Sequence, residues 1–172
     1  MPVPYQAPAI ANWFIDKNRE DNSSLTHFKI QKFLYFSQGF HLANFETPLF
    51  EDGIEAWKYG PVVDAVYHAL KQYNDDEIVN PIKGHYFLKG KLFFGIPEIE
   101  SEDDLSIRFL NIFWSKYSKI DPRQLVDMSH DENGPWKLIV QGILEKKTAS
   151  QVIPKQLIKN YFSTYINKSN IR

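Results

Sequence analysis

One segment, from His27 to about Asn44, has the pattern of a helix that is apolar around most of its circumference. Ile30, Phe33 and Leu34 recur at helical spacing on one side, and further aromatic residues widen that stripe. Thr26 precedes the segment as an N-cap, because its hydroxyl can accept from an early helical N–H group. A helix with so much apolar surface must be covered on several sides. We therefore predict that it is the central helix of the fold.

The composition favours an aromatic core in one domain. The chain has 172 residues, the usual size of a single domain, and 15% of them are aromatic, with 13 Phe, 9 Tyr and 4 Trp. Large rings must therefore fill much of the interior. We find no internal repeat and no linker longer than a few residues, so we expect residues 1–172 to form a single domain.

Other helices are indicated on both sides of the central segment. A start at Pro8 and a stripe of Ile10, Trp13 and Phe14 predict a helix that runs to about Arg19. Later helix starts are marked by prolines or by capping residues, and a last helix runs to about residue 167. These starts lie at Pro61, Ser101, Asp121–Pro122, Gly134–Pro135 and Pro154.

The helix that begins at Ser101 has a well-marked start and a clear stripe. Three acids follow Ser101, and they favour the positive end of the helix dipole. Its stripe consists of Leu105, Phe109, Ile112 and Phe113. A stripe of this kind ordinarily faces the core.

Two short β elements complete the expected fold. Residues Ile54 to Tyr59 alternate in side-chain direction as a short strand does, and Gly60 ends it before a helix that starts at Pro61. Two apolar runs flank Lys89–Gly90, which predicts a two-residue hairpin. The expected fold class is therefore mainly α (α+β): a compact helical domain of about six helices with a short strand and a small β-hairpin.

Several classes of protein are excluded by the composition. The chain contains no cysteine, which removes disulfides, thiolate metal sites and a cysteine nucleophile, and a reduced compartment suffices. The N-terminus lacks the features of a signal peptide, and no apolar run approaches the roughly 18 residues of a membrane span. A net charge of −1 and a pI near 6.5 argue against a dedicated nucleic-acid binder. We expect a cytoplasmic protein without membrane contact.

The charge is nevertheless unevenly distributed. Residues 74–104 hold eight acids and three lysines, a net of −5, and residues 145–172 hold six bases and one acid, a net of +5. These regions either attract each other or a partner, or they are ordinary solvated faces, which is what charge runs usually are.

We find no pattern typical of a cofactor or metal site. The glycines lack the spacing of a nucleotide-binding loop. The histidines are dispersed, and no pair has the four-residue spacing with which one helix face binds zinc. They are His27, His41, His68, His85 and His130. We predict no cofactor.

The richest polar cluster is Ser129–His130–Asp131–Glu132. In one interpretation His130 is the general base of a cryptic hydrolase or nuclease, assisted by Asp131 or Glu132. In the other it caps the C-terminal end of the helix that begins at Pro122, where a cation suits the helix dipole. Adjacent helical residues do not face one another, so we favour the second interpretation.

Three large rings are either core residues or interface anchors. Trp57 and Tyr59 end the predicted strand, with Lys58 between them, and Trp136 follows a proline. Burial in the core is the commoner outcome, but Trp and Tyr also dominate binding hot spots. We therefore keep both interpretations open.

Five stretches of the chain, taken together, resemble the Panacea domain family, which includes SocA-like antitoxins and phage-associated GepA-like proteins. The similarity extends from Ile10 to Phe162 and is weakest from Tyr73 to Glu100. The stretches are LTHFKIQKFLYFSQGFHLA, PLF, IEAWKYGPVVDAVYHALKQY, LVDMSHDENGPW and IKNYF.

The resemblance implies a mainly helical protein without enzymatic activity. It implies an antitoxin of a bacterial or prophage toxin–antitoxin system, which neutralises its cognate protein toxin by direct binding. A second mechanism in such a family is an adaptor that delivers the toxin to a Clp-type protease. Whether the chain forms a homodimer is left open. On this basis we expect the partner-binding residues to be Trp57, Lys58, Tyr59, His130 and Trp136.

Overall fold

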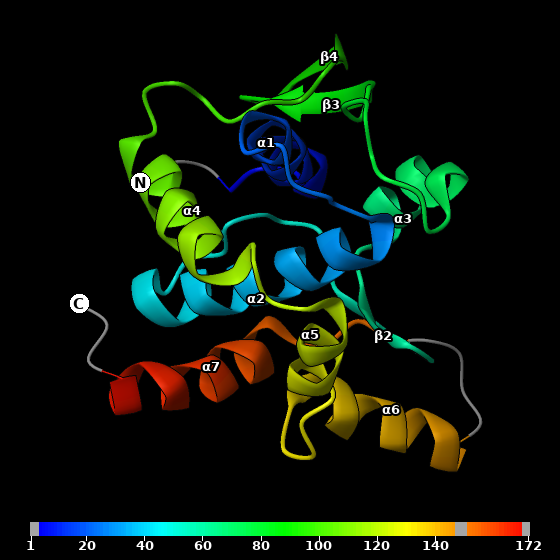
Figure 1. Cartoon of the computed structure of the whole chain (residues 1–172). Coiled ribbons are helices and arrows are strands. Elements are labelled where there is room, and N and C mark those ends of the chain that lie inside the picture. Colours follow the sequence, from blue (N-terminus) through cyan, green and yellow to red (C-terminus); the bar gives the residue numbers. More distant parts are fainter. Residues whose placement is uncertain (1–3, 147–150, 170–172) are drawn as a thin grey trace.

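The computed structural model describes residues 4–146 and 151–169, and this part of the chain is mainly helical, as predicted. It contains seven α-helices, one short 3-10 helix and two separate two-stranded antiparallel sheets (Figure 1). The helices are α1 (Ala7–Glu20), α2 (His27–Phe45), α3 (Asp64–Leu70), α4 (Asp104–Tyr117), α5 (Pro122–Ser129), α6 (Pro135–Lys146) and α7 (Lys155–Ser169), with the 3-10 turn η1 at Lys71–Tyr73. The strands are β1 (Glu55–Trp57), β2 (Gly60–Val62), β3 (Gly84–Leu88) and β4 (Lys91–Gly95).

Helix α2 is the centre of the fold, as its sequence predicts. Figure 1 shows it in the middle of the molecule, with α1 on one side and α7 on the other. Every residue from 30 to 39 is buried. The predicted cap is confirmed, because the Thr26 hydroxyl accepts from the Lys29 backbone N–H at 3.3 Å.

Two groups of aromatic rings pack on opposite sides of α2. On the α1 and α4 side, the Phe33 ring meets those of Phe14, Phe113 and Trp114, with centroids 5.3, 5.7 and 5.8 Å away. On the α7 side, the Phe162 ring meets those of Tyr35, Phe36 and Phe40, with centroids 5.5, 6.1 and 4.9 Å away. Centroid distances in this range suit edge-to-face and tilted ring pairs. The predicted aromatic core is confirmed.

The prediction that a helix begins at Pro61 is wrong. Pro61 lies in β2, opposite Ala56 of β1, and α3 begins at Asp64. The reason is a contact with α2: the Val63 N–H donates to the Gln31 side-chain oxygen at 2.8 Å, and the Gln31 amide donates to the Val63 carbonyl at 3.4 Å. These two bonds hold the chain extended for three residues beyond Gly60.

Helix α4 presents a different face to the core from the one that its stripe predicts. The helix begins at Asp104 and not at Ser101, and the Asp103 side chain caps it. Its buried side chains are Ser106, Leu110, Phe113 and Trp114, whereas Leu105 and Ile112 are 46% and 49% exposed. Part of the stripe that we expected to be buried is therefore open to solvent.

The predicted hairpin is confirmed as β3 and β4. Both turn residues, Lys89 and Gly90, have positive φ angles of 48° and 76°, which suit the tight turns of two-residue hairpins. The register pairs Phe87 with Leu92, so both lie on one face of the hairpin, and both are exposed. The hairpin therefore carries apolar side chains on its outer face.

The basic C-terminal region does not pair with the acidic region in the part of the chain that the structure describes. Lys155 and Lys159 of α7 instead form ion pairs with Glu51 and Glu46, at 2.8 and 2.9 Å. No described helix is both long and apolar enough to span a membrane. Over the same residues, no three metal-ligating side chains converge.

Candidate functional site

The five residues proposed for partner binding meet where the β1–β2 turn contacts the α5–α6 loop. The His130 ring stacks on the Trp136 ring, with centroids 4.0 Å apart and planes 14° apart. The Trp136 indole N–H donates to the Trp57 carbonyl at 2.8 Å, and the His130 ring hydrogen-bonds to the Tyr59 backbone. We call Trp57, Lys58, Tyr59, His130 and Trp136 the signature cluster.

The signature cluster has a buried base and an exposed tip. Trp136 is buried, and Trp57 is half-buried against the Tyr67 ring, 4.7 Å between centroids. At the tip, Tyr59 is 73% exposed, and the Lys58 ammonium lies 5.0 Å from the centre of its ring. Each interpretation therefore holds for one ring: Trp136 is a core residue and Tyr59 faces solvent, while Trp57 lies at the boundary between core and surface.

Lys32 and Gly60 belong to the same site, although we did not select them from the sequence. Lys32 extends from α2 and is only 2% exposed. Its ammonium lies beside Gly60 in the space that a side chain at position 60 would need, and the His130 Nε2 atom lies 3.2 Å from the same point. The φ angle of Gly60 is +133°, in a region that L side chains rarely adopt.

The sequence did contain a signal for Lys32. Because α2 is apolar around most of its circumference, a lysine in its middle has no solvent-facing side to occupy. Within residues 4–146 and 151–169, its ammonium has no hydrogen-bond or ion-pair partner, and it lies 5.2 Å from the centre of the Phe28 ring. A buried lysine without a counter-ion is rare, since desolvation of the charge is costly.

Burial and charge shift both titratable groups of this site toward their neutral forms. Burial lowers the pKa of Lys32 to about 8. Burial, and then the nearby charge of Lys32, lower the pKa of His130. His130 is the C-cap residue of α5, as predicted, but its lowered pKa disfavours the cation that we expected there. Its ring stacks on that of Trp136.

The structure gives no support to a His130–carboxylate pair. Asp131 accepts from the Asn133 backbone N–H at 2.8 Å, and Glu132 forms an ion pair with Lys137 at 3.1 Å. The His130 Nε2 atom is buried, and it has no hydrogen-bond partner among the residues described. The general-base interpretation thus lacks the hydrogen bond on which it depends.

Replacing Lys32 by methionine is expected to raise the free energy of unfolding at pH 7 by up to about 3 kcal/mol. The reason is that folding lowers the pKa of Lys32 from 10.5 to about 8, so the charged lysine destabilises the folded state. Between those two values the unfolded chain binds the proton more tightly, so wild-type stability rises with pH. The advantage of K32M should therefore shrink from pH 8 upward. Urea unfolding at pH 7, 8, 9 and 10 measures this difference.

The exposed Lys58→Met substitution is the matched control for this measurement. It removes the same charged group from a solvent-facing position, so its effect on stability should be small and nearly independent of pH. Tyrosines with raised pKa values lower stability above about pH 10, but this effect is the same in wild type and in each variant, so it cancels in the difference between them. A K32M advantage that stays constant from pH 7 to 10 would contradict the burial argument.

Residues 30–137 match the family model described as antitoxin SocA-like, Panacea domain. The chain is also 30% identical over 141 residues to the antitoxin SocA of Caulobacter vibrioides (strain NA1000 / CB15N), a match that covers 82% of this chain and 73% of that protein. No solved structure matches the chain significantly. The family match includes α2 from Ile30 onward, both strands of the turn and the complete signature cluster.

Proposed function

Because this chain belongs to the SocA-like Panacea domain family of antitoxins, we propose that it neutralises a cognate protein toxin by binding it directly. Sequestration of this kind needs a binding surface and no chemical step by the chain itself. The proposal is consistent with the half-buried His130, whose pKa is lowered by burial and whose Nε2 atom has no hydrogen-bond partner among the described residues. The observation that carries the choice of surface is the exposed tip of the signature cluster.

The tip has the physical properties of a binding anchor. Tyr59 combines a large ring, a hydroxyl and few rotatable bonds, and such residues contribute strongly at the centres of interfaces. Its backbone is held by the hydrogen bond with His130, and the neighbouring Trp57 carbonyl is held by Trp136. A rigid base reduces the conformational entropy that the tip loses on binding. Lys58 adds a positive charge that favours an acidic patch on the toxin.

The test begins with a genetic assay. Genes that flank this one are expressed singly and together with it, and a toxin is expected to arrest growth alone and to be harmless with this protein. Rescue is then repeated in cells that lack Clp-type proteases. Rescue that persists supports sequestration, whereas rescue that disappears would indicate delivery to the protease. Failure of every flanking gene to behave in this way would contradict the proposal.

The purified pair then tests the surface. Tyr59→Ala is expected to weaken toxin binding by about 30-fold, the effect of losing a hot-spot side chain of roughly 2 kcal/mol. Its melting temperature should stay near that of wild type, because the ring packs little against the rest of the fold. Phe87→Ala, at an aromatic residue that is 62% exposed on the hairpin, is the control. Unchanged affinity in Y59A, or an equal loss in F87A, would show that the tip is not the anchor.

A further inference from the structure

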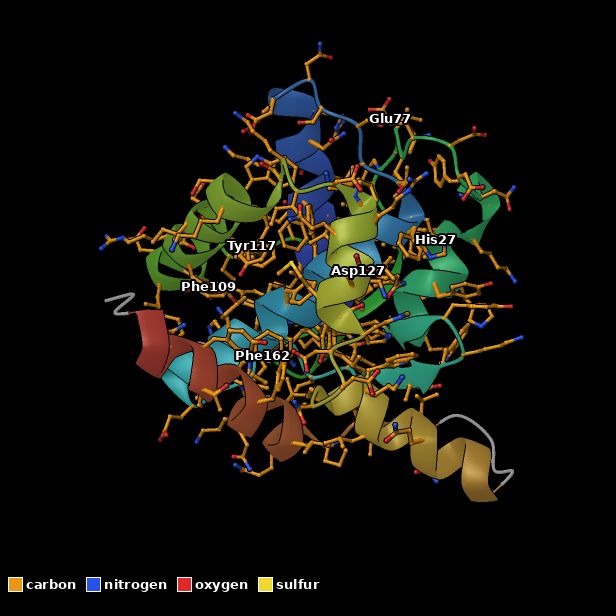
Figure 2. All side chains as sticks on the ribbon, turned by 60° about the horizontal axis from the view of Figure 1, so that its bottom comes forward. His27, Glu77, Phe109, Tyr117, Asp127 and Phe162 are labelled. Atoms are coloured by element: carbon orange, nitrogen blue, oxygen red, sulfur yellow. The ribbon has the colours of Figure 1, made fainter. Side chains whose placement is uncertain are left out.

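A second surface, separate from the signature cluster, is an apolar groove beside α4. It has a volume of about 340 Å³ and lies between α4, the C-terminal end of α2 and Ile166 of α7. Figure 2 shows Phe109 and Tyr117 on α4, on the same side of the molecule as these two helix ends. The groove is apolar over most of its lining. Its walls include Phe40, Phe45, Leu105, Phe109, Ile112 and Ile166.

The groove exists because α4 has two apolar faces and the fold covers only one of them fully. Its inner face packs on α1 and α2 through Leu110, Phe113 and Trp114. The second face follows Leu105, Phe109 and Ile112, at positions i, i+4 and i+7, over about two turns of helix. A partner helix that packs on such a stripe presents residues with the same spacing. The uncovered length suits a short helical segment.

Rings that pack against one another stiffen the floor and one wall of the groove. The Tyr117 ring stacks on that of Phe113, 4.5 Å between centroids and 8° between planes, and it also meets Phe40 at 5.6 Å. Elsewhere in the lining, the Phe109 ring meets that of Phe45, with centroids 5.8 Å apart. These contacts hold the surface in place before any partner arrives. Pre-organisation of this kind lowers the entropic cost of binding.

The rim of the groove is basic. Arg108 and Lys116 line it, and neither forms an ion pair with a residue that the structure describes. No carboxylate is among the lining residues, and Asp104 lines an adjoining hollow that shares Arg108 and Ile112 with the groove. An occupant with acidic residues beside its apolar ones would therefore complement the groove in charge.

We propose that the groove binds an acidic amphipathic helix of a partner protein. A second copy of this chain fits less well, because a two-fold interface would bring Arg108 and Lys116 close to the same residues of the other copy. Repulsion between like charges then opposes the contact. The inference does not depend on the proposed toxin contact at Tyr59, which lies on other elements.

The test uses the full-length protein and a display library of random peptides about 16 residues long, roughly four helical turns. Peptides are selected on wild type and then sorted by their affinity for Ile112→Glu, a change at a half-exposed position. Peptides that lose about 10-fold or more on I112E should carry a net negative charge and apolar residues at i, i+3 or i+4, and i+7. Circular dichroism should show that they become helical when bound.

Charge reversal supplies the specific control. The double variant Arg108→Glu/Lys116→Glu should weaken these acidic peptides by about 10-fold or more and should select basic ones instead. Arg123→Glu/Lys71→Glu makes the same change in net charge at exposed positions away from the groove and should have little effect. Melting curves verify that each variant is folded, and Leu105→Glu replaces I112E if the latter is not.

Three outcomes would overturn the inference. The first is that no selected peptide depends on Ile112 or Leu105. The second is that the dependent peptides lack negative charge or helical spacing. The third is that wild type is a dimer in light scattering and I112E is a monomer, which would make a second copy the occupant.

Discussion

Replacing Gly39 by alanine is expected to lower the free energy of unfolding by about 2–3 kcal/mol, although alanine is the better helix former. Gly39 lies where α2 crosses α7, and a methyl group there would overlap the Phe162 ring, with the Cγ atom at 2.7 Å. Tyr35, Phe36 and Phe40 surround that ring and leave it little room to move. The substitution should therefore force the two helices apart.

The matched control is Gly142→Ala in α6, where no atom lies within 4 Å of the added methyl group. It should gain about 0.5–1 kcal/mol from helix propensity alone. Phe162→Leu in the G39A background should recover part of the loss, because the smaller side chain removes the overlap. Urea unfolding of the four proteins and of F162L completes the cycle. If G39A is as stable as wild type, α7 does not pack closely on α2.

Features that depend on neighbouring residues could be predicted from the sequence. Thr26 caps α2, and Asp121 caps α5 before a proline, because the capping group and its N–H partners are two or three residues apart. The Lys89–Gly90 turn was equally recognisable. The central place of α2 followed from its apolar circumference, which no single partner can cover.

Features set by contacts across the fold could not be predicted. The chain stays extended past Pro61 because Gln31, some 30 positions earlier, bonds both backbone groups of Val63. The orientation of α4 depends on which of its two apolar faces packs better. Trp114 settled that choice, since it reaches the Phe14 and Phe33 rings and donates to Asp21 at 2.6 Å.

The signature cluster was chosen from residue types and from the family resemblance, and the structure brings its members together. That choice missed Lys32 and Gly60. A lysine on a helix that is apolar around most of its circumference was a signal, and Gly60 was explained by its turn alone. Their importance lies in one contact between α2 and the β1–β2 turn, which neither signal predicts.

Gly60→Ala is expected to cost about 3 kcal/mol of stability and to abolish the toxin neutralisation that we propose for this chain. The φ angle of +133° strains any L side chain, at about 1–3 kcal/mol. In addition, the new methyl group would overlap the Lys32 ammonium and touch His130 Nε2 at 3.2 Å. Because both groups are buried, one of them or the turn must move. We expect the turn to move and to carry the Lys58–Tyr59 tip with it.

Two further variants separate the strain from the overlap. Gly90→Ala, at φ +76° with no atom within 4 Å, should show a backbone cost of about 1–2 kcal/mol and no effect on neutralisation. In a Lys32→Met background, the G60A substitution should cost less than in wild type. Methionine ends near the position of the lysine Cε atom, 3.6 Å from the added methyl group, so the overlap is gone while the strain remains. Equal costs of G60A in the two backgrounds would mean that overlap with the Lys32 ammonium does not destabilise the turn. Toxin affinity and the free energy of unfolding are measured for each variant, so that a loss of binding can be told from a loss of stability.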